Sequence, residues 1–265
     1  MPRASRISAG GLCYHVLNRG NGRATVFAHP EDYAAFLAVL TEACERLPIR
    51  LLAYCLMPNH FHFVVWPLED GDLGRWMSWL MTTHVRRYHA HHETEGRLWQ
   101  GRYKAFPIQC DEHLLTVMRY VERNPVRATS LDVTSASAWP WSSAAELSAG
   151  PFPMVRPEVH PGPVPRRADW LAWVDRPLTA GEQEAIHRSI ARGSPFGESD
   201  WVASMAGRLK LGHTLKPLGR PRKKGTSPVS ATDSPGEGQA VCDGRETGDV
   251  PFFIEPRGRR SRSGH

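Results

Sequence analysis

Two short apolar segments joined by a tight turn, set between segments of helical periodicity, limit the possible folds more than any other feature of this sequence. Residues 50–57 and 61–66 are rich in apolar and aromatic side chains, and Pro58-Asn59 between them is typical of a turn. Consecutive strands joined by so short a connection pair antiparallel. The sequence therefore predicts a mostly antiparallel sheet rather than the parallel sheet of a doubly wound fold.

Helices and strands alternate around this hairpin. The spacing of apolar residues predicts strands at 12–18 and 103–110 and helices at 30–47, 72–92 and 111–124. The resulting order is strand, helix, strand, strand, helix, strand, helix, which indicates an α+β fold with the helices packed on one face of the sheet. The sequence has neither a GxGxxG loop after a strand nor a GxxxxGK[ST] loop, so a nucleotide-binding fold is not indicated.

A change of composition after about residue 150 predicts four parts along the chain. Residues 8–150 form the expected core domain, and the prolines of 151–177 are typical of a linker. Residues 178–218 contain two short helical patterns around a Gly-Ser-Pro break and are a candidate DNA-binding segment. Residues 219–265 are poor in apolar residues and rich in Ser, Pro and Gly, which predicts a basic, largely disordered tail.

Charge and cysteine content limit which partners and which cellular compartment can be expected. The chain has 33 Lys and Arg against 27 Asp and Glu, a net charge of +6 and a pI of about 9.3. This excess suits a nucleic-acid partner, although many basic proteins bind none. Five cysteines without a CxxC pair argue against a disulfide framework or a cysteine zinc site. No apolar run approaches the roughly 20 residues of a membrane helix, so we expect a soluble, cytoplasmic protein.

A pair of histidines lies on the second predicted hairpin strand. His60 and His62 are two residues apart, so both side chains point to the same face of a strand. Two neutral imidazoles side by side can bind a metal ion. The alternative is two surface histidines among the 13 of the chain. The apolar flanks favour the metal-binding interpretation, because a strand that is buried on one face needs a reason to carry two imidazoles on the other.

A tyrosine and an asparagine share a face of the last predicted core helix. Tyr120 and Asn124 are four residues apart and therefore one turn apart. Three arginines surround them: Arg119, Arg123 and Arg127. Arginines hold phosphate oxygens and lower the pKa of a nearby phenol, so Tyr120 is a candidate nucleophile toward a phosphate. The alternatives are an exposed tyrosine and an asparagine that ends the helix before the following proline.

Two further basic segments suit contact with nucleic acid. Arg102 and Lys104 lie beside aromatic residues at the start of a predicted strand, an arrangement that can hold phosphates and stack bases. The alternative there is a solvated edge strand. Arg220, Arg222 and Lys223 form a short extended motif of the kind that enters narrow A·T-rich minor grooves. The alternative for this second segment is a solubilising tail.

Four motifs, in this order, resemble those of single-tyrosine HUH transposases, the IS200-like family. They are MPNHFHFVV at 57–65, LWQGRYK at 98–104, YVERNPVRA at 120–128 and WPWSS at 139–143. The third motif has Asn rather than Gln four residues after its Tyr, which is similar to the branch called REP-associated tyrosine transposases. The RGSPFG stretch at 192–197 and Trp201 resemble the C-terminal region of that branch.

The resemblance implies both a fold and a reaction. The family core is a ferredoxin-like, RNA-recognition-like antiparallel sheet. By resemblance, His60, His62 and Asn124 bind a divalent metal, Mg or Mn, and Tyr120 is the nucleophile. The implied activity is that of a metal-dependent transposase, which nicks and rejoins single-stranded DNA at hairpin-forming, REP-like sequences through a 5′-phosphotyrosine intermediate. The implied partner is single-stranded or hairpin DNA, bound by a monomer or a homodimer.

Two hypotheses of function therefore stand side by side. The first is the DNA-cleaving enzyme, and the second is a domesticated, non-catalytic DNA-binding protein of the same fold. All four catalytic positions are filled, which favours the enzyme. An RNA-binding module is a weaker third alternative, because the aromatic RNP signature is absent. The expected DNA contacts are Arg102, Lys104, Arg123, Arg127, Arg220, Arg222 and Lys223.

Overall fold

The apolar segments of the first half form a four-stranded antiparallel sheet with the strand order β2-β3-β1-β4. The strands are β1 (Cys13–Arg19), β2 (Ile49–Met57), β3 (His60–Pro67) and β4 (Lys104–Ile108). β2 and β3 form the hairpin expected from the sequence, with Met57 opposite His60 beside the turn. Together with the order β1-α1-β2-β3-α2-β4, this arrangement is the ferredoxin-like topology, so the expected α+β fold is confirmed.

The computed structural model describes residues 8–147 and 155–216. Residues up to Lys216 form one compact unit, to which all the statements below refer. The expected DNA contacts Arg220, Arg222 and Lys223, and the expected tail 219–265, lie outside the described residues.

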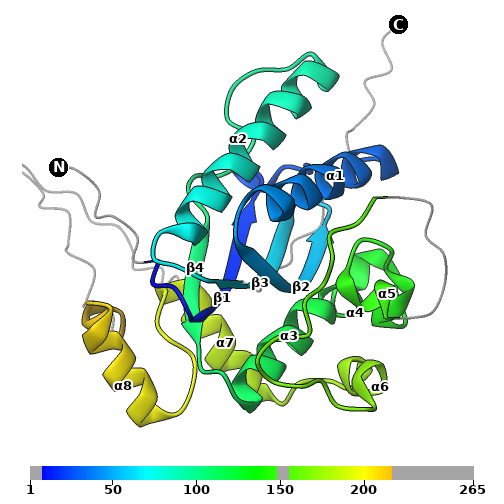
Figure 1. Cartoon of the computed structure of the whole chain (residues 1–265). Coiled ribbons are helices and arrows are strands. Elements are labelled where there is room, and N and C mark those ends of the chain that lie inside the picture. Colours follow the sequence, from blue (N-terminus) through cyan, green and yellow to red (C-terminus); the bar gives the residue numbers. More distant parts are fainter. Residues whose placement is uncertain (1–7, 148–154, 217–265) are drawn as a thin grey trace, which may run out of the picture. The chain divides into compact units, whose positions relative to one another are not determined.

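Two helices cover one face of the sheet, as Figure 1 shows: α1 (Pro30–Arg46) and α2 (Asp72–His92). α1 begins at a proline, and its first turn is capped by the Asp32 carboxylate, which accepts hydrogen bonds from the N–H groups of Ala28 and His29. The rings of Phe36 and Trp76 pack beside Phe63 of β3. These contacts bury the apolar face that strand alternation predicted.

The opposite face of the sheet is covered as well, by α3 (Glu112–Glu122) and α7 (Ala180–Arg192). The expectation of helices on one face therefore holds for α1 and α2 and does not extend to α3. The physical reason is that the strands are apolar on both faces, with Leu17, Cys55 and Val64 on the second face at most 3% exposed. A sheet with two apolar faces needs a cover on each.

The remaining helices follow α3 along the chain. They are α4 (Asn124–Arg127), α5 (Ser143–Glu146), α6 (Trp170–Asp175) and α8 (Ser199–Arg208), with short 3₁₀ turns at Asn21–Arg23, Thr129–Leu131, Ala136–Ala138 and Gly212–Thr214. The helix expected to stop before Pro125 does so, since α3 ends at Glu122, and the short helix α4 begins at Asn124. A proline is tolerated there because it lies in the first turn of this short helix, where its missing N–H has no helical partner in any case.

Residues 155–177, expected as a linker, contact the core domain. The N–H of His160 donates to the Leu51 carbonyl at 2.8 Å, and the Arg166 guanidinium donates to the Leu52 carbonyl at 2.5 Å. Thr179 caps the start of α7, where its side chain and that of Glu182 form a reciprocal capping box. The division of the chain into a catalytic domain, a linker, a helical segment and a tail stays a prediction.

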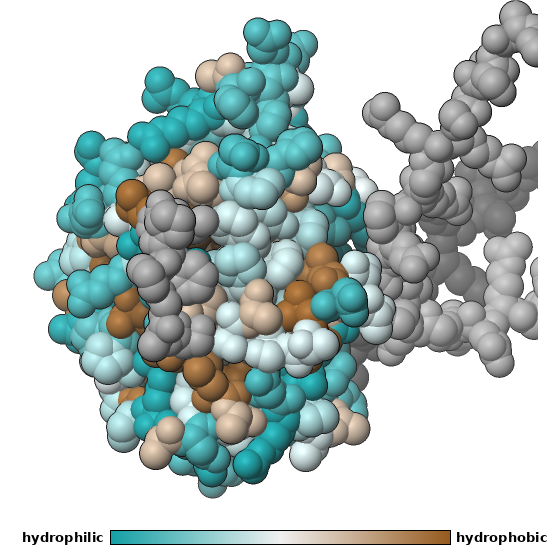
Figure 2. Space-filling view, turned by 90° about the vertical axis from the view of Figure 1, so that its right-hand side faces the viewer, coloured by the Kyte–Doolittle hydropathy of each residue, from teal (hydrophilic) through white to brown (hydrophobic). Residues whose placement is uncertain are grey.

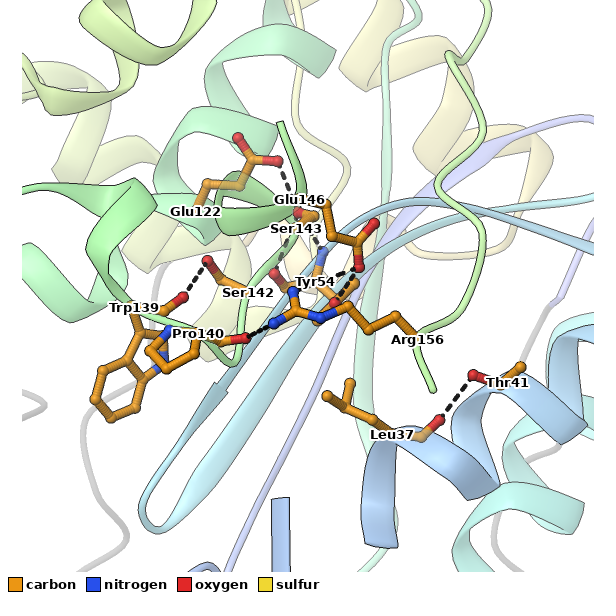
Figure 3. A network of polar contacts seen from close by, with 10 residues as sticks. All are labelled: Leu37, Thr41, Tyr54, Glu122, Trp139, Pro140, Ser142, Ser143, Glu146 and Arg156. Carbon is orange, nitrogen blue, oxygen red and sulfur yellow. Dashed lines mark hydrogen bonds and ion pairs between the residues drawn. The ribbon is translucent and has the colours of Figure 1, made fainter. Parts of the chain in front are cut away.

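A buried carboxylate connects α3 to three other elements. Glu122 accepts hydrogen bonds from the Ser143 hydroxyl of α5 and from the Trp170 indole of α6, each at 2.7 Å. Ser143 in turn accepts from the Tyr54 N–H of β2 at 3.0 Å, and the Tyr54 hydroxyl donates to Glu146 (Figure 3). Burial raises the pKa of Glu122. Because a buried polar group is costly when unpaired, this network favours one position of α3 on the sheet.

The surface seen in Figure 2 is a mosaic in which apolar areas are separated by hydrophilic ones. Among the described residues, the exposed large apolar side chains are Leu68, Leu147, Val155 and Leu215. Within residues 8–147 and 155–216, none of the helices combines the length and the apolar character needed to cross a lipid bilayer.

The buried histidine of α2 gives a testable dependence of stability on pH. His84 contacts the rings of Phe27, Phe36 and Trp99, and burial lowers its pKa to about 3. The unfolded chain binds a proton on this imidazole below pH ~6.5, whereas the folded chain binds it only near pH 3. The contribution of His84 to the free energy of unfolding is therefore constant above pH ~6.5. Below that pH, the free energy of unfolding falls by about 1.4 kcal/mol per pH unit. His84→Phe should remove this part of the slope.

Denaturant unfolding between pH 4 and pH 7 measures the effect. A matched control is His91→Gln, because His91 is exposed on the same helix. We expect the control to keep the slope of the unmodified protein. An unchanged slope in His84→Phe would contradict the assignment of His84 as a buried neutral imidazole.

Candidate functional site

β3 and α3 bring two predicted groups together on the second face of the sheet. His60 and His62 of β3 are 3% and 1% exposed, and their ring centroids are 5.0 Å apart. The ring of Tyr120, from α3, lies edge-on to His62 at 5.8 Å. Residues that are 58 or more positions apart in the sequence therefore share one buried site, because α3 packs across β3.

The two imidazoles of β3 are neutral. Burial lowers the pKa of His60 to about 3, with a further contribution from the nearby Arg19 and Arg127 guanidinium groups. Burial also lowers the pKa of His62 well below its ordinary value, and the neighbouring His60 and His15 add to this effect. A neutral imidazole is the form that binds a metal ion, so the pair is in the state that the metal-binding interpretation requires.

Each of these imidazoles uses its Nδ1 atom for a hydrogen bond. Nδ1 of His60 is 2.6 Å from the Asn59 side-chain oxygen, an arrangement that places the proton on Nδ1 and the lone pair on Nε2. Nδ1 of His62 is 2.9 Å from Nε2 of His15, a buried residue of β1. Such second partners orient metal-binding histidines and select their tautomer.

The donor set around these histidines fits a divalent metal with oxygen ligands completing the site. No group of three or more His, Cys, Asp or Glu residues able to hold a metal occurs in the part of the chain that the structure describes. The predicted third ligand, Asn124, is a residue of another type. Asn124 is buried, and its amide nitrogen donates to the carbonyls of Tyr120 and Val121, at 2.9 and 3.3 Å. The remaining polar atom of this side chain is the oxygen, a ligand suited to Mg or Mn.

The phenol of Tyr120 is buried and next to arginine. Its side chain is 2% exposed, and the Arg127 guanidinium lies 4.9 Å from its ring centroid. Burial raises the pKa of Tyr120, while Arg127 and Arg19 lower it by a smaller amount. The expectation that arginines give this phenol a lowered pKa is therefore wrong for this structure, because desolvation of the phenolate outweighs the attraction of the two cations.

Arg119 of α3 and Arg123, the residue that follows α3, hold carbonyl groups of another segment. The guanidinium of Arg119 donates to the carbonyls of Arg176 and Pro177, both at 2.8 Å, and that of Arg123 donates to the Asp175 carbonyl at 3.2 Å. These bonds hold the C-terminal end of α3 against the last residue of α6 and the two residues after it. They correct the expectation that Arg119 and Arg123 supply the positive charge around Tyr120, which comes from Arg127 and Arg19 instead.

The predicted DNA contacts Arg102 and Lys104 are exposed beside the first residues of β4. Lys104 pairs with Leu17 of β1. Two residues further along β1, Arg19 pairs with His60. Arg102 and Lys104 therefore lie near the end of β1 that reaches the histidine pair.

Three residues of the site were not predicted from the sequence. His15 and Arg19 lie on β1, on the same side of the strand as the histidine pair because they alternate with Tyr14, Val16 and Asn18. His187 of α7 places its ring 5.9 Å from that of Tyr120. Strand alternation is a signal that could have identified His15 and Arg19. Nothing in the sequence around His187 connects it to a tyrosine 67 positions away.

Residues 8–124 match the model of the family described as "Transposase IS200 like". A curated protein of Haemophilus influenzae, named as a candidate REP-associated tyrosine transposase, is 25% identical over 118 residues. That alignment covers 41% of this chain and 66% of the relative, just under two thirds of its length.

Two solved structures are also similar. A REP-associated tyrosine transposase bound to a REP hairpin has 18% sequence identity and a TM-score of 0.46, covering 63% of this chain and 98% of that chain. A candidate transposase from Deinococcus radiodurans has 19% identity and a TM-score of 0.34, covering 46% of this chain and 94% of that chain.

Proposed function

We propose that the chain nicks and rejoins single-stranded DNA at hairpin-forming, REP-like sequences, as a step of DNA transposition; the match of residues 8–124 to the family model described as "Transposase IS200 like" supports this proposal. The observation that carries the proposal is the convergence of His60, His62 and Tyr120 in one site. A pair of neutral imidazoles beside a phenol suits metal-assisted attack on a phosphodiester. The REP-like character of the DNA is proposed from the name of the Haemophilus relative and from the motif around Asn124, which resembles that of the REP-associated branch.

His60, His62 and Asn124 are the residues proposed to hold a divalent metal, Mg or Mn. When bound, this ion polarises the scissile phosphate and stabilises the charge that develops on its oxygens. Two imidazoles suit manganese better than magnesium, which prefers carboxylate and water ligands. Asn59 holds the imidazole of His60, and His15 holds that of His62, each through the Nδ1 atom of the ring that is held.

Tyr120 is the proposed nucleophile. Its oxygen attacks the phosphorus, the bond from phosphorus to the 3′ oxygen breaks, the phenol proton passes to solvent, and the departing 3′ oxygen takes up a proton. The products are a 5′-phosphotyrosine link and a free 3′-OH. A second 3′-OH can reverse the step and join strands, because the energy of the phosphodiester is kept in the covalent link. Arg127 stabilises the phenolate during attack.

The proposed nucleophile is covered in this structure. Tyr120 is 2% exposed, and His187 of α7 packs against its ring. A DNA phosphate can reach the phenol only after part of this cover moves. The same observation favours the second candidate function, a non-catalytic DNA-binding protein that keeps the fold, because a permanently covered phenol cannot attack.

One experiment separates the two candidates. The full-length chain is incubated with a labelled DNA hairpin carrying single-stranded flanks, in the presence of manganese, and the products are run on a denaturing gel. A covalent protein–DNA adduct supports the enzyme. Binding of the hairpin without any adduct, over a range of flanking sequences, would support the non-catalytic protein and refute the proposed activity.

The basic surface gives a prediction about salt. Arg102, Lys104 and Arg127 are proposed to contact phosphates, and each such contact releases a counterion. Affinity for single-stranded DNA should then fall steeply with added salt. In the double variant Arg102→Gln/Lys104→Gln, the slope of log affinity against log salt concentration should become less steep by about 0.7 per charge removed. Arg46→Gln is the matched control, because this exposed arginine of α1 pairs with Glu42. Equal slopes in both variants would contradict the assignment.

Fluorescence anisotropy across a series of salt concentrations provides the measurement. Arg123 is also among the proposed contacts, but its guanidinium already bonds to the Asp175 carbonyl, so we expect less from it. Arg220, Arg222 and Lys223 remain proposed DNA contacts outside the described residues.

A further inference from the structure

A cavity of about 650 Å³ lies between α2 and residues 96–103. It is separate from the candidate site, because α2 covers the opposite face of the sheet. Its lining is apolar on the inside, with the side chains of Met77, Met81, Leu98 and Trp99. Cavities of this size commonly hold small ligands or parts of larger ones.

The rim of this cavity is positively charged. Arg86, Arg97 and Arg102 line it and are exposed, and no Asp or Glu is among the lining residues. An apolar interior with a cationic rim matches a nucleotide, which combines a flat ring and a phosphate.

The cavity and the candidate site lie on the two faces of one strand end. Asn18 lines the cavity, whereas the next residue, Arg19, lies near the Tyr120 phenol on the other face. Residues 96–103 are fixed over this strand end: the Asn18 amide donates to the Gly101 carbonyl at 3.1 Å, and the Gln100 N–H donates to the Arg19 carbonyl at 2.8 Å. The cavity and the candidate site are therefore separated only by the end of β1.

We propose that this cavity receives one unpaired nucleobase of the DNA strand, with an adjacent phosphate held by the rim arginines. The inference rests on the proposed function, because it adds a second contact with the same DNA. Charge complementarity favours this occupant over an apolar peptide segment, because an apolar segment offers no negative charge to the three guanidinium groups of the rim. Stacking and burial of a base are tolerant of sequence, since every base has two apolar ring faces.

A cavity-filling variant tests the proposal. Gly74 of α2 lines the cavity, and a Cβ added there meets no atom within 4 Å, so Gly74→Leu places a side chain in the cavity without a backbone clash. Leucine is also the better helix former, which protects the fold. The matched control is Gly207→Leu, because Gly207 of α8 has equally open space at its Cβ and does not line the cavity.

The probes are oligothymidylate and an abasic oligonucleotide of the same length, bound to the full-length chain without metal. We expect the unmodified protein and Gly207→Leu to prefer oligothymidylate by about tenfold, and Gly74→Leu to lose most of this preference while binding the abasic strand unchanged. The proposal is overturned if Gly74→Leu keeps the preference, if it weakens both probes equally, or if the unmodified protein shows no preference. This binding assay involves no cleavage. A failed adduct experiment would therefore refute the proposed enzyme activity without deciding whether the cavity binds a base.

Discussion

Replacing Tyr120 by phenylalanine is expected to abolish the covalent protein–DNA adduct while leaving the fold and the affinity for DNA intact. The change removes only the phenol oxygen, and the ring keeps its edge contacts with His15, His62 and His187. The interaction of the Arg127 guanidinium with the ring face also survives. Loss of the adduct without loss of binding would then be due to the missing nucleophile alone.

The measurement combines a denaturing gel with peptide mapping of the adduct from the unmodified protein. Tyr88→Phe is the matched control, because Tyr88 is a partly buried tyrosine of α2 on the other side of the sheet. We expect this control to form the adduct at the normal rate. An adduct that persists in Tyr120→Phe, or that maps to another tyrosine, would remove Tyr120 from the proposed role.

The fold was largely predictable because its elements follow local rules. The hairpin turn at Pro58-Asn59 and the proline at the start of α1 each have one favoured conformation. The helices on the second face were not predicted, because the strands were expected to be buried on one face only. In the structure, β2 and β3 are buried along nearly their whole length, without alternation. A continuous apolar run indicates a strand buried on both faces, and this signal was present in the sequence.

The site was predictable only where residues are close in the sequence. His60 and His62 share a strand, so their common face follows from the period of the strand. The charge around Tyr120 could not be assigned in this way. Arg119 is next to it in sequence but bonds to carbonyls after α6, whereas Arg19 is 101 positions away and lies near the phenol. Which arginine faces a helical tyrosine depends on what packs on each side of the helix.

The second large effect is expected at the two histidines proposed to bind metal. His62→Ala removes one imidazole of the proposed pair and should abolish both cleavage and measurable manganese binding, with the sheet still formed. Asn124→Ala should be milder, because water replaces an oxygen ligand of a hard cation at small cost. His15→Phe should lie between them, with a loss of manganese affinity of about tenfold, since it leaves His62 in place but removes the partner of its Nδ1 atom.

Calorimetric titration with manganese distinguishes these variants without any need for activity. His84→Phe serves as the control, because it replaces an equally buried neutral imidazole that contacts α1 and Trp99 rather than the site. If loss of metal came only from damage to the core, this control would lose affinity as His62→Ala does. Unchanged manganese affinity in His62→Ala would refute the proposed metal site. A normal affinity in His15→Phe together with loss in His62→Ala would show instead that the imidazole pair binds metal without needing its β1 partner.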